Sequence, residues 1–182
     1  MSTNQRISSF NATNWRISSF NGVLLAAYFI PTWTILAFRI MVSPVHSFFE
    51  RENVSAAFFA SDYLHLAATG MVRTAWLLAL SRLIVVAFFA VFVMLLTRSV
   101  IRRTGGCDEA LSVALGIGSL ICFCMMVMAS LVHEPEAMRL HATEFLMLIG
   151  TAIVMLVDRP AERRAEQDAE TPALGEPQLL NR

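Results

Sequence analysis

Residues 110–132, ALSVALGIGSLICFCMMVMASLV, decide the fold, because they contain no ionisable side chain apart from two cysteines. A helix that crosses a hydrocarbon core of about 30 Å needs about 20 mainly apolar residues. The segment meets this requirement, and it lacks the strict alternation of a membrane strand. We therefore predict a transmembrane helix here.

Three further apolar segments have a similar character, at residues 22–42, 74–97 and 140–157. The 182-residue chain is 56% hydrophobic and only 15% charged, which leaves too few charges to cover the surface of a water-soluble domain of this size. In the 110–132 segment, small residues recur every fourth position from Ala110 to Cys122, a pattern that lets helices approach closely in lipid. The sequence therefore predicts an all-α integral membrane protein with four transmembrane helices packed as a bundle.

The segments outside these spans are expected to differ from one another. Residues 1–21 are predicted to form a cytoplasmic N-terminal segment that can lie in the membrane interface. Residues 54–69, preceded by Asn53 as a helix cap, are predicted to form a short extracytoplasmic helix between the first and second spans. Residues 158–182, rich in Pro, Glu, Arg and Gln, are expected to be a disordered cytoplasmic tail.

The distribution of arginine predicts the orientation. Arg98, Arg102 and Arg103 lie between the second and third spans, and further arginines flank the bundle on both sides of residues 22–157. Because positive residues favour the cytoplasmic side, we expect both termini to be cytoplasmic. All the basic residues are Arg and none is Lys, which suggests a GC-rich genome and hence a bacterial inner membrane.

Three ionisable side chains other than histidine and cysteine fall within the predicted spans: Arg39, Arg82 and Glu144. Each costs about 2.5–3.5 kcal/mol to insert, so each is a candidate functional residue. Counted along the helices, all three lie about 5 to 12 Å below the outer surface, so we expect Glu144 to meet one or both arginines.

Other polar residues extend this cluster. Tyr28 and Thr32 share a helix face with Arg39, and His141 shares one with Glu144 and Thr151. One interpretation is an outward-facing vestibule for an ion, a proton or a polar solute. The other is a clamp that fixes the helices to each other, with Arg39 reaching towards the headgroups by itself.

The sequence contains none of the common motifs of nucleotide-binding, zinc-protease or serine-hydrolase sites, so no catalytic residue is predicted. No cofactor is expected: the histidines fall in or beside predicted loops, which disfavours haem, and their spacing matches no metal-ligand pattern. Cys122 and Cys124 point about 200° apart on a helix and cannot grip one ion together. A neutral net charge with no basic block excludes nucleic acid as a partner.

These observations predict a small non-enzymatic protein of the membrane. We expect it to be an accessory or scaffold subunit that contacts the lipid bilayer and other membrane proteins, or further copies of itself. The alternative is an oligomeric transporter or channel for an ion or small polar solute that uses the Arg39, Arg82 and Glu144 cluster. A redox membrane protein is a third hypothesis.

Overall fold

A computed structural model describes residues 17–98 and 106–170, with side chains over 19–98 and 107–157. Across these ranges the chain forms helices and short turns, with no strand. The four long helices are α1 (Ile17–Val42), α4 (Ala68–Thr97), α6 (Gly106–Leu131) and α7 (Pro135–Glu170). Each contains an apolar stretch long enough to cross a membrane, the last ending at Val157. The predicted all-α membrane bundle is confirmed, and the chain is a multi-pass membrane protein.

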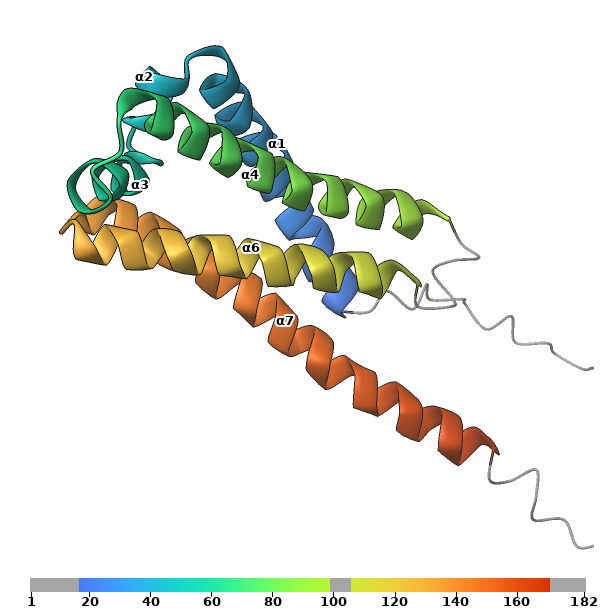
Figure 1. Ribbon diagram of the computed structural model, residues 1–182. Helices are drawn as coiled ribbons and strands as arrows, with labels where there is room; N and C mark the ends of the chain where they lie inside the picture. Colours follow the sequence, from blue (N-terminus) through green and yellow to red (C-terminus); the bar gives the residue numbers. More distant parts are fainter. Residues whose placement is uncertain (1–16, 99–105, 171–182) are drawn as a thin grey trace, which may run out of the picture.

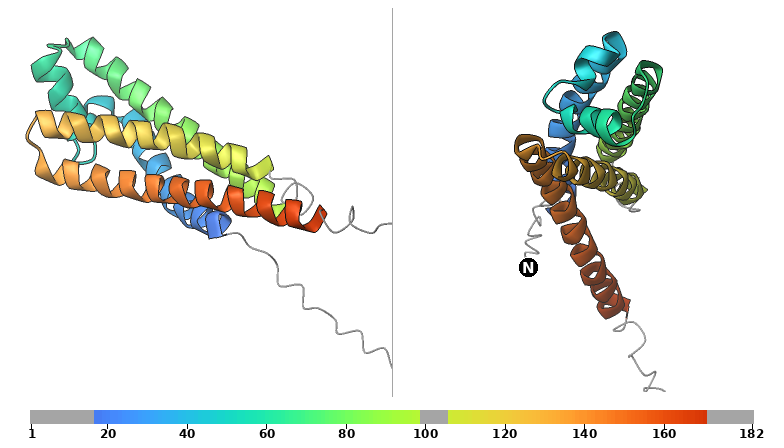
Figure 2. Two further views of the ribbon diagram at one scale, coloured as in Figure 1. Left: turned by 90° about the horizontal axis from the view of Figure 1, so that it is seen from below. Right: turned by 60° about the vertical axis from the view of Figure 1, so that its left-hand side comes forward.

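The four helices close into a ring. Helix α4 packs between α1 and α6, and α7 packs along α6 (Figure 1). Helix α7 also meets α1, but this seam is the sparsest of the four. The short connecting helices gather at one end of the bundle, and the described chain ends point towards the other end (Figure 2). We call the end formed by residues 43–67 and 132–134 the loop end.

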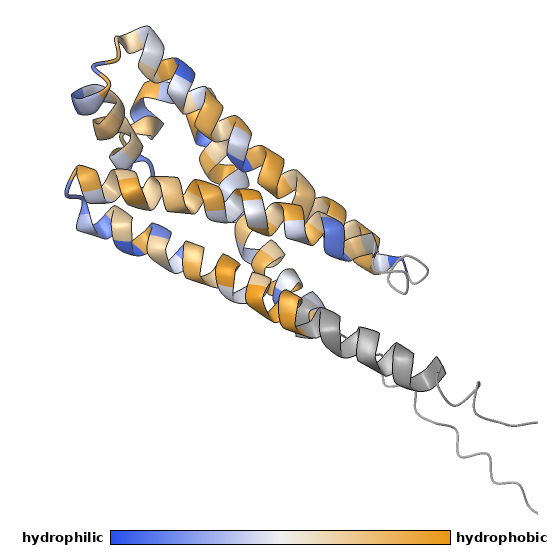
Figure 3. Ribbon diagram, turned by 60° about the horizontal axis from the view of Figure 1, so that its bottom comes forward, coloured by the Kyte–Doolittle hydropathy of each residue, from blue (hydrophilic) through white to orange (hydrophobic). Residues whose placement is uncertain are grey.

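Hydrophobic residues cover most of the four long helices, while hydrophilic residues are concentrated at the loop end and at the start of α6 (Figure 3). This distribution matches helices whose middle portions face lipid on the outside and each other on the inside. The bundle therefore has the length and the surface expected of a membrane-spanning domain.

The connection from α1 to α4 differs from the single helix predicted over residues 54–69. It contains α2 (Pro44–Phe48), α3 (Val54–Phe58) and a π-helical turn, η1 (Phe59–Tyr63). Asn53 occupies the N-cap position of α3, as predicted, but its side chain makes no capping hydrogen bond. It donates instead to the Ser47 carbonyl at 2.9 Å and so ties α3 to α2. His65 has a left-handed backbone with φ 47°, which ends the helical run before residue 69.

Several predicted boundaries are also shifted. Helix α4 begins at Ala68 rather than at residue 74, and α7 begins at Pro135 rather than at residue 140. Helix α7 continues to Glu170, so residues 158–170 are helical and not the predicted disordered tail. The sequence there is rich in Ala, Glu, Arg and Gln, which favour helix. Residues 1–16 of the predicted N-terminal segment, 99–105 of the linker and 171–182 of the tail lie outside the described residues.

Two apolar clusters fill the bundle. The larger one, towards the chain ends, includes Phe29, Phe89 and Leu148, and the smaller one, at the loop end, includes Ile40 and Met125. The predicted ridge of small residues on α6 is buried within the larger cluster. It brings α7 close: a Cβ atom added at Gly118 would lie 3.3 Å from the Leu148 side chain. The buried side chains also include three ionisable ones, Arg82, His141 and Glu144.

Candidate functional site

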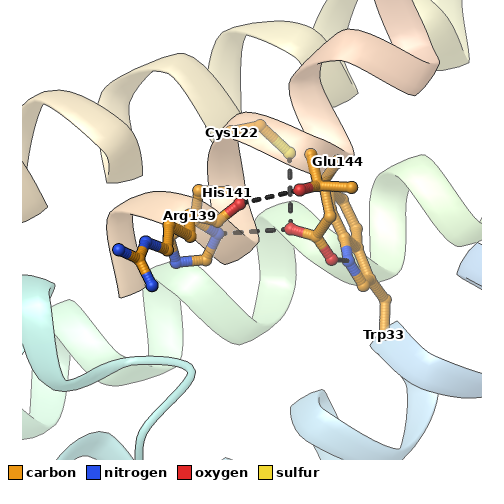
Figure 4. A network of polar contacts seen from close by, with 6 residues as sticks. Trp33, Cys122, Arg139, His141 and Glu144 are labelled. Carbon is orange, nitrogen blue, oxygen red and sulfur yellow. Dashed lines mark hydrogen bonds and ion pairs between the residues drawn. The ribbon is translucent and has the colours of Figure 1, made fainter. Parts of the chain in front are cut away.

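The carboxylate of Glu144 is the centre of a buried polar network (Figure 4). The indole nitrogen of Trp33 donates to its Oε1 at 3.3 Å. Its other oxygen, Oε2, lies 3.2 Å from Nδ1 of His141 and 3.7 Å from Sγ of Cys122. With Glu144 ionised, Nδ1 of His141 carries the proton and donates to it. Trp33 belongs to α1 and Cys122 to α6, whereas His141 belongs to α7, the helix of Glu144 itself. The contacts of Glu144 therefore join α1, α6 and α7.

Arg82 occupies the middle of α4, and its side chain is 2% exposed. Its guanidinium carbon lies 5.9 Å from the centroid of the Trp33 ring. Among the described residues Arg82 has no hydrogen bond and no ion pair, and its Nε and Nη1 atoms are buried without a partner. The carboxylates whose charges act on it are Glu144 and Glu52. A buried guanidinium without hydrogen bonds or an ion pair lowers the stability of the folded protein.

A cavity of about 150 Å³ lies beside Arg82 and Glu144. Its walls come from α1, α4, α7 and the connection between α2 and α3: Tyr28, Thr32, Trp33, Leu36, Glu52, Arg82, Leu140, His141 and Glu144. A cavity of similar volume in another protein admits benzene, so there is room for about six non-hydrogen atoms. Unlike that apolar example, this cavity is lined largely by polar side chains.

Many of these polar groups have unused hydrogen-bonding capacity. Nε2 of His141 is buried without a partner. The hydroxyl groups of Tyr28 and Thr32 and the carboxylate of Glu52 make no hydrogen bond with any described residue. Tyr28, Thr32 and Glu52 are at least partly exposed, so the buried groups that lack a partner here are those of Arg82 and His141. Since buried polar groups are almost always satisfied in folded proteins, these two residues make the cavity suited to a polar guest.

The connection that carries Glu52 is attached to the two helices that border the cavity. Glu50 meets Arg39 of α1 at 3.4 Å, and Arg51 meets Glu136 of α7 at 2.9 Å. Glu52, the next residue, lines the cavity itself. Of these three consecutive residues, Glu50 pairs with α1, Arg51 pairs with α7, and Glu52 covers the loop end of the cavity. Each exposed ion pair is worth little alone, so the two pairs contribute little to the stability of this cover.

Five of the six predicted site residues lie together on this cavity: Tyr28, Thr32, Arg82, His141 and Glu144. Arg39 does not join them. Its side chain is 55% exposed and pairs with Glu50. Arg39 is on the predicted face of α1, but it lies about 10 Å further along the axis than Thr32. The predicted meeting of Arg39 with Glu144 is therefore wrong.

The predicted depth of Arg82 below the outer surface stays a prediction, but its distance from the start of the helix differs from the one counted from residue 74. Because α4 begins at Ala68, Arg82 lies about 21 Å along the axis from the start of the helix. Thr151 is buried on the same helix as Glu144, as expected, but its hydroxyl donates to the Met147 carbonyl at 3.1 Å.

Three residues with polar contacts or charge at the site were not predicted, Trp33, Cys122 and Glu52, and neither were the apolar lining residues Leu36 and Leu140. Trp33 has a usable signal, because a buried indole N–H usually needs a hydrogen-bond acceptor. Cys122 resembles any small core residue of α6. Glu52 reaches the cavity only through the folding of the α2–α3 connection, which leaves no local pattern.

Within the part of the chain that the structure describes, no group of three or more His, Cys, Asp or Glu side chains has an arrangement that could hold a metal ion. The other three histidines, His46, His65 and His133, are exposed at the loop end.

No protein-family model, no curated protein and no solved structure matches the chain.

Proposed function

We propose that this protein is a membrane transporter or channel that binds a small polar solute in the cavity between α1, α4 and α7. One observation carries the proposal. The buried side chains of Arg82 and His141 line the cavity and hold nitrogen atoms without a partner. A solute with hydrogen-bond acceptors would satisfy the guanidinium, and one with a donor would also satisfy His141.

A purely structural role explains the site less well. A polar cluster that only holds helices together stabilises the bundle most when its opposite charges form a direct ion pair. A buried charge without an ion pair lowers the stability of the bundle. Glu144 does act as a clamp, since it joins three helices, but Arg82 makes no ion pair with it. An accessory or scaffold subunit is therefore our second proposal: it accounts for the Glu144 network and leaves the position of Arg82 unexplained.

The cavity lies nearer the loop end than the chain ends. Towards the chain ends, Phe29 stacks on Phe89 with ring centroids 5.8 Å apart, and the larger apolar cluster fills the bundle. Passage of a solute across the membrane therefore requires helices to move. The sparse seam between α1 and α7, which borders the cavity, is the place where least packing would be lost.

We further propose that the loop end faces the extracytoplasmic side of a bacterial inner membrane, with both termini cytoplasmic, because of the arginine distribution. The solute then enters from outside, past the cover formed by residues 50–52. Four helices are too few to enclose a wide pore across the membrane. We therefore propose that the functional protein is an oligomer of this chain.

Osmotic swelling of vesicles tests this function. The full chain is reconstituted, and light scattering follows the entry of glycine, acetate or urea. Wild-type vesicles should swell faster than protein-free vesicles with at least one of these solutes. Arg82→Gln should abolish the difference, because it removes the unpaired guanidinium. Arg73→Gln is the matched control, since Arg73 is an exposed arginine on the same helix and away from the cavity.

Arg82→Lys guards against misfolding, because it keeps the charge and loses the planar set of donors. If Arg82→Gln does not elute as a folded protein, Arg82→Lys takes its place. Wild-type vesicles that swell no faster than protein-free vesicles with all three solutes would contradict the proposal. So would folded Arg82 variants that swell like wild type.

A further inference from the structure

The charges that line the cavity restrict the solute it can hold. Arg82 contributes one positive charge, while Glu144 and Glu52 contribute one negative charge each. Glu144 is already occupied by Trp33, His141 and Cys122. The charged groups left without partners are therefore one cation, Arg82, and one anion, Glu52.

These two groups come from different parts of the fold. Arg82 is in the middle of α4, whereas Glu52 lies on the connection that covers the loop end of the cavity. A solute in the cavity therefore has a guanidinium near one part of its surface and a carboxylate near another. Neither group has a hydrogen bond or ion pair among the described residues.

A simple anion fits this arrangement poorly. It would satisfy Arg82, but it would also bring a further negative charge close to Glu52 and Glu144 in a medium that screens charge weakly. A simple cation would pair with Glu52 and leave the buried donors of Arg82 unused. A zwitterion satisfies both groups and adds no net charge to the membrane interior.

The uncharged groups favour the same kind of solute. When Nδ1 of His141 donates to Glu144 and the ring carries no second proton, Nε2 is an acceptor, and the hydroxyls of Tyr28 and Thr32 accept hydrogen bonds as well. An ammonium group, with three donors, can use these acceptors together with Glu52. A volume that admits about six non-hydrogen atoms limits the zwitterion to the size of glycine or alanine.

We infer that the cavity selects a small zwitterionic amino acid, whose carboxylate faces Arg82 and whose ammonium group faces Glu52. The inference rests on the proposed solute-binding function and adds the class of solute to it. It also assigns to Glu52 a part in selectivity, distinct from the structural ion pairs of its neighbours Glu50 and Arg51.

Thermal unfolding of the full chain in detergent tests this assignment with three probes at equal concentration: glycine, acetate and methylammonium. A ligand that binds the folded state raises the unfolding midpoint. At saturating concentration we expect glycine to raise it by roughly 5 °C, with acetate and methylammonium each giving a smaller shift, because each satisfies only one of the two charged groups. Tryptophan, which is too large for the cavity, should give no shift.

Glu52→Gln should reduce the glycine shift, because the ammonium group loses its partner, and should raise the acetate shift, because a negative charge that opposes the anion is removed. The retained acetate response shows that the variant is folded. Glu109→Gln, an exposed carboxylate at the start of α6, is the control and should behave like wild type.

The outcomes separate the two proposals. Equal shifts with glycine and acetate, a larger shift with methylammonium, or a glycine shift unaffected by Glu52→Gln would overturn the zwitterion assignment. In those cases the dependence of swelling on Arg82 still supports solute binding. No shift with any probe, together with no swelling above protein-free vesicles, would overturn both.

Discussion

The Arg82 guanidinium lies 5.9 Å from the centroid of the Trp33 ring, and Trp33 donates its indole N–H to Glu144 at 3.3 Å. One aromatic side chain thus contacts a buried cation through its ring and a buried carboxylate through its edge. Trp33 is in turn held edge-on by Phe29, with ring centroids 4.9 Å apart. This arrangement keeps the two charges close but separate, which leaves room for the cavity.

Trp33→Phe should therefore weaken both the bundle and the site. The change keeps an aromatic ring beside Arg82 but leaves Oε1 of Glu144 without its donor, a loss of about 1–3 kcal/mol in stability. Thermal unfolding and vesicle swelling measure the two effects. Trp76→Phe, at an exposed position on α4, should change neither. Equal behaviour of the two variants would mean that the indole donor does not matter.

Arg82 and Glu144 should be energetically coupled although they form no direct ion pair. Arg82→Gln or Glu144→Gln alone leaves the other buried charge without the opposite charge that acts on it, and we expect a coupling energy of about 0.5–3 kcal/mol between the two positions. The double variant removes both charges and should be more stable than the sum of the single changes implies. Unfolding free energies of the four proteins complete the cycle, and strict additivity would refute the coupling.

The helices of this bundle could be predicted from the sequence, and so could three buried ionisable residues, Arg82, His141 and Glu144. Hydropathy located the spans, and helical spacing placed Tyr28 with Thr32 and His141 with Glu144. Hydropathy does not report where a helix ends, so α4 and α7 extend beyond their predicted limits. Arg39 lies on the predicted face of α1, but it is too far along the helix axis to reach the cavity. Glu52 reaches the cavity through the tertiary fold of the α2–α3 connection, which leaves no local pattern in the sequence.

A close helix contact should make Gly22 sensitive to substitution. A Cβ atom there would lie 2.8 Å from the Phe92 ring and 2.9 Å from the Leu111 side chain. Gly22→Ala should therefore destabilise the protein by about 1–3 kcal/mol. Gly116→Ala is the control, because a Cβ atom added there would have no neighbour within 4 Å and alanine favours helix. Stabilisation by both changes in thermal unfolding would contradict this packing.

The turn between α6 and α7 offers a stabilising change. His133 follows α6 with a left-handed φ of 60°, and the N–H of Glu134 closes the helix end on the Ala129 carbonyl at 3.0 Å. Glycine adopts this conformation without a steric penalty, so His133→Gly should raise stability by about 1 kcal/mol. The same change at His46, inside α2, should lower stability. A lower unfolding midpoint for His133→Gly would show that the His133 side chain makes a larger contribution than its backbone strain.

Equilibrium binding of radiolabelled glycine to the purified full chain tests the proposed solute site most directly. We predict saturable binding to the wild type and to Arg73→Gln, and its loss in Arg82→Gln and in Arg82→Lys. Saturable binding that survives in both folded Arg82 variants, or no saturable binding to the wild type, would contradict the claim that the cavity beside Arg82 holds a small polar solute.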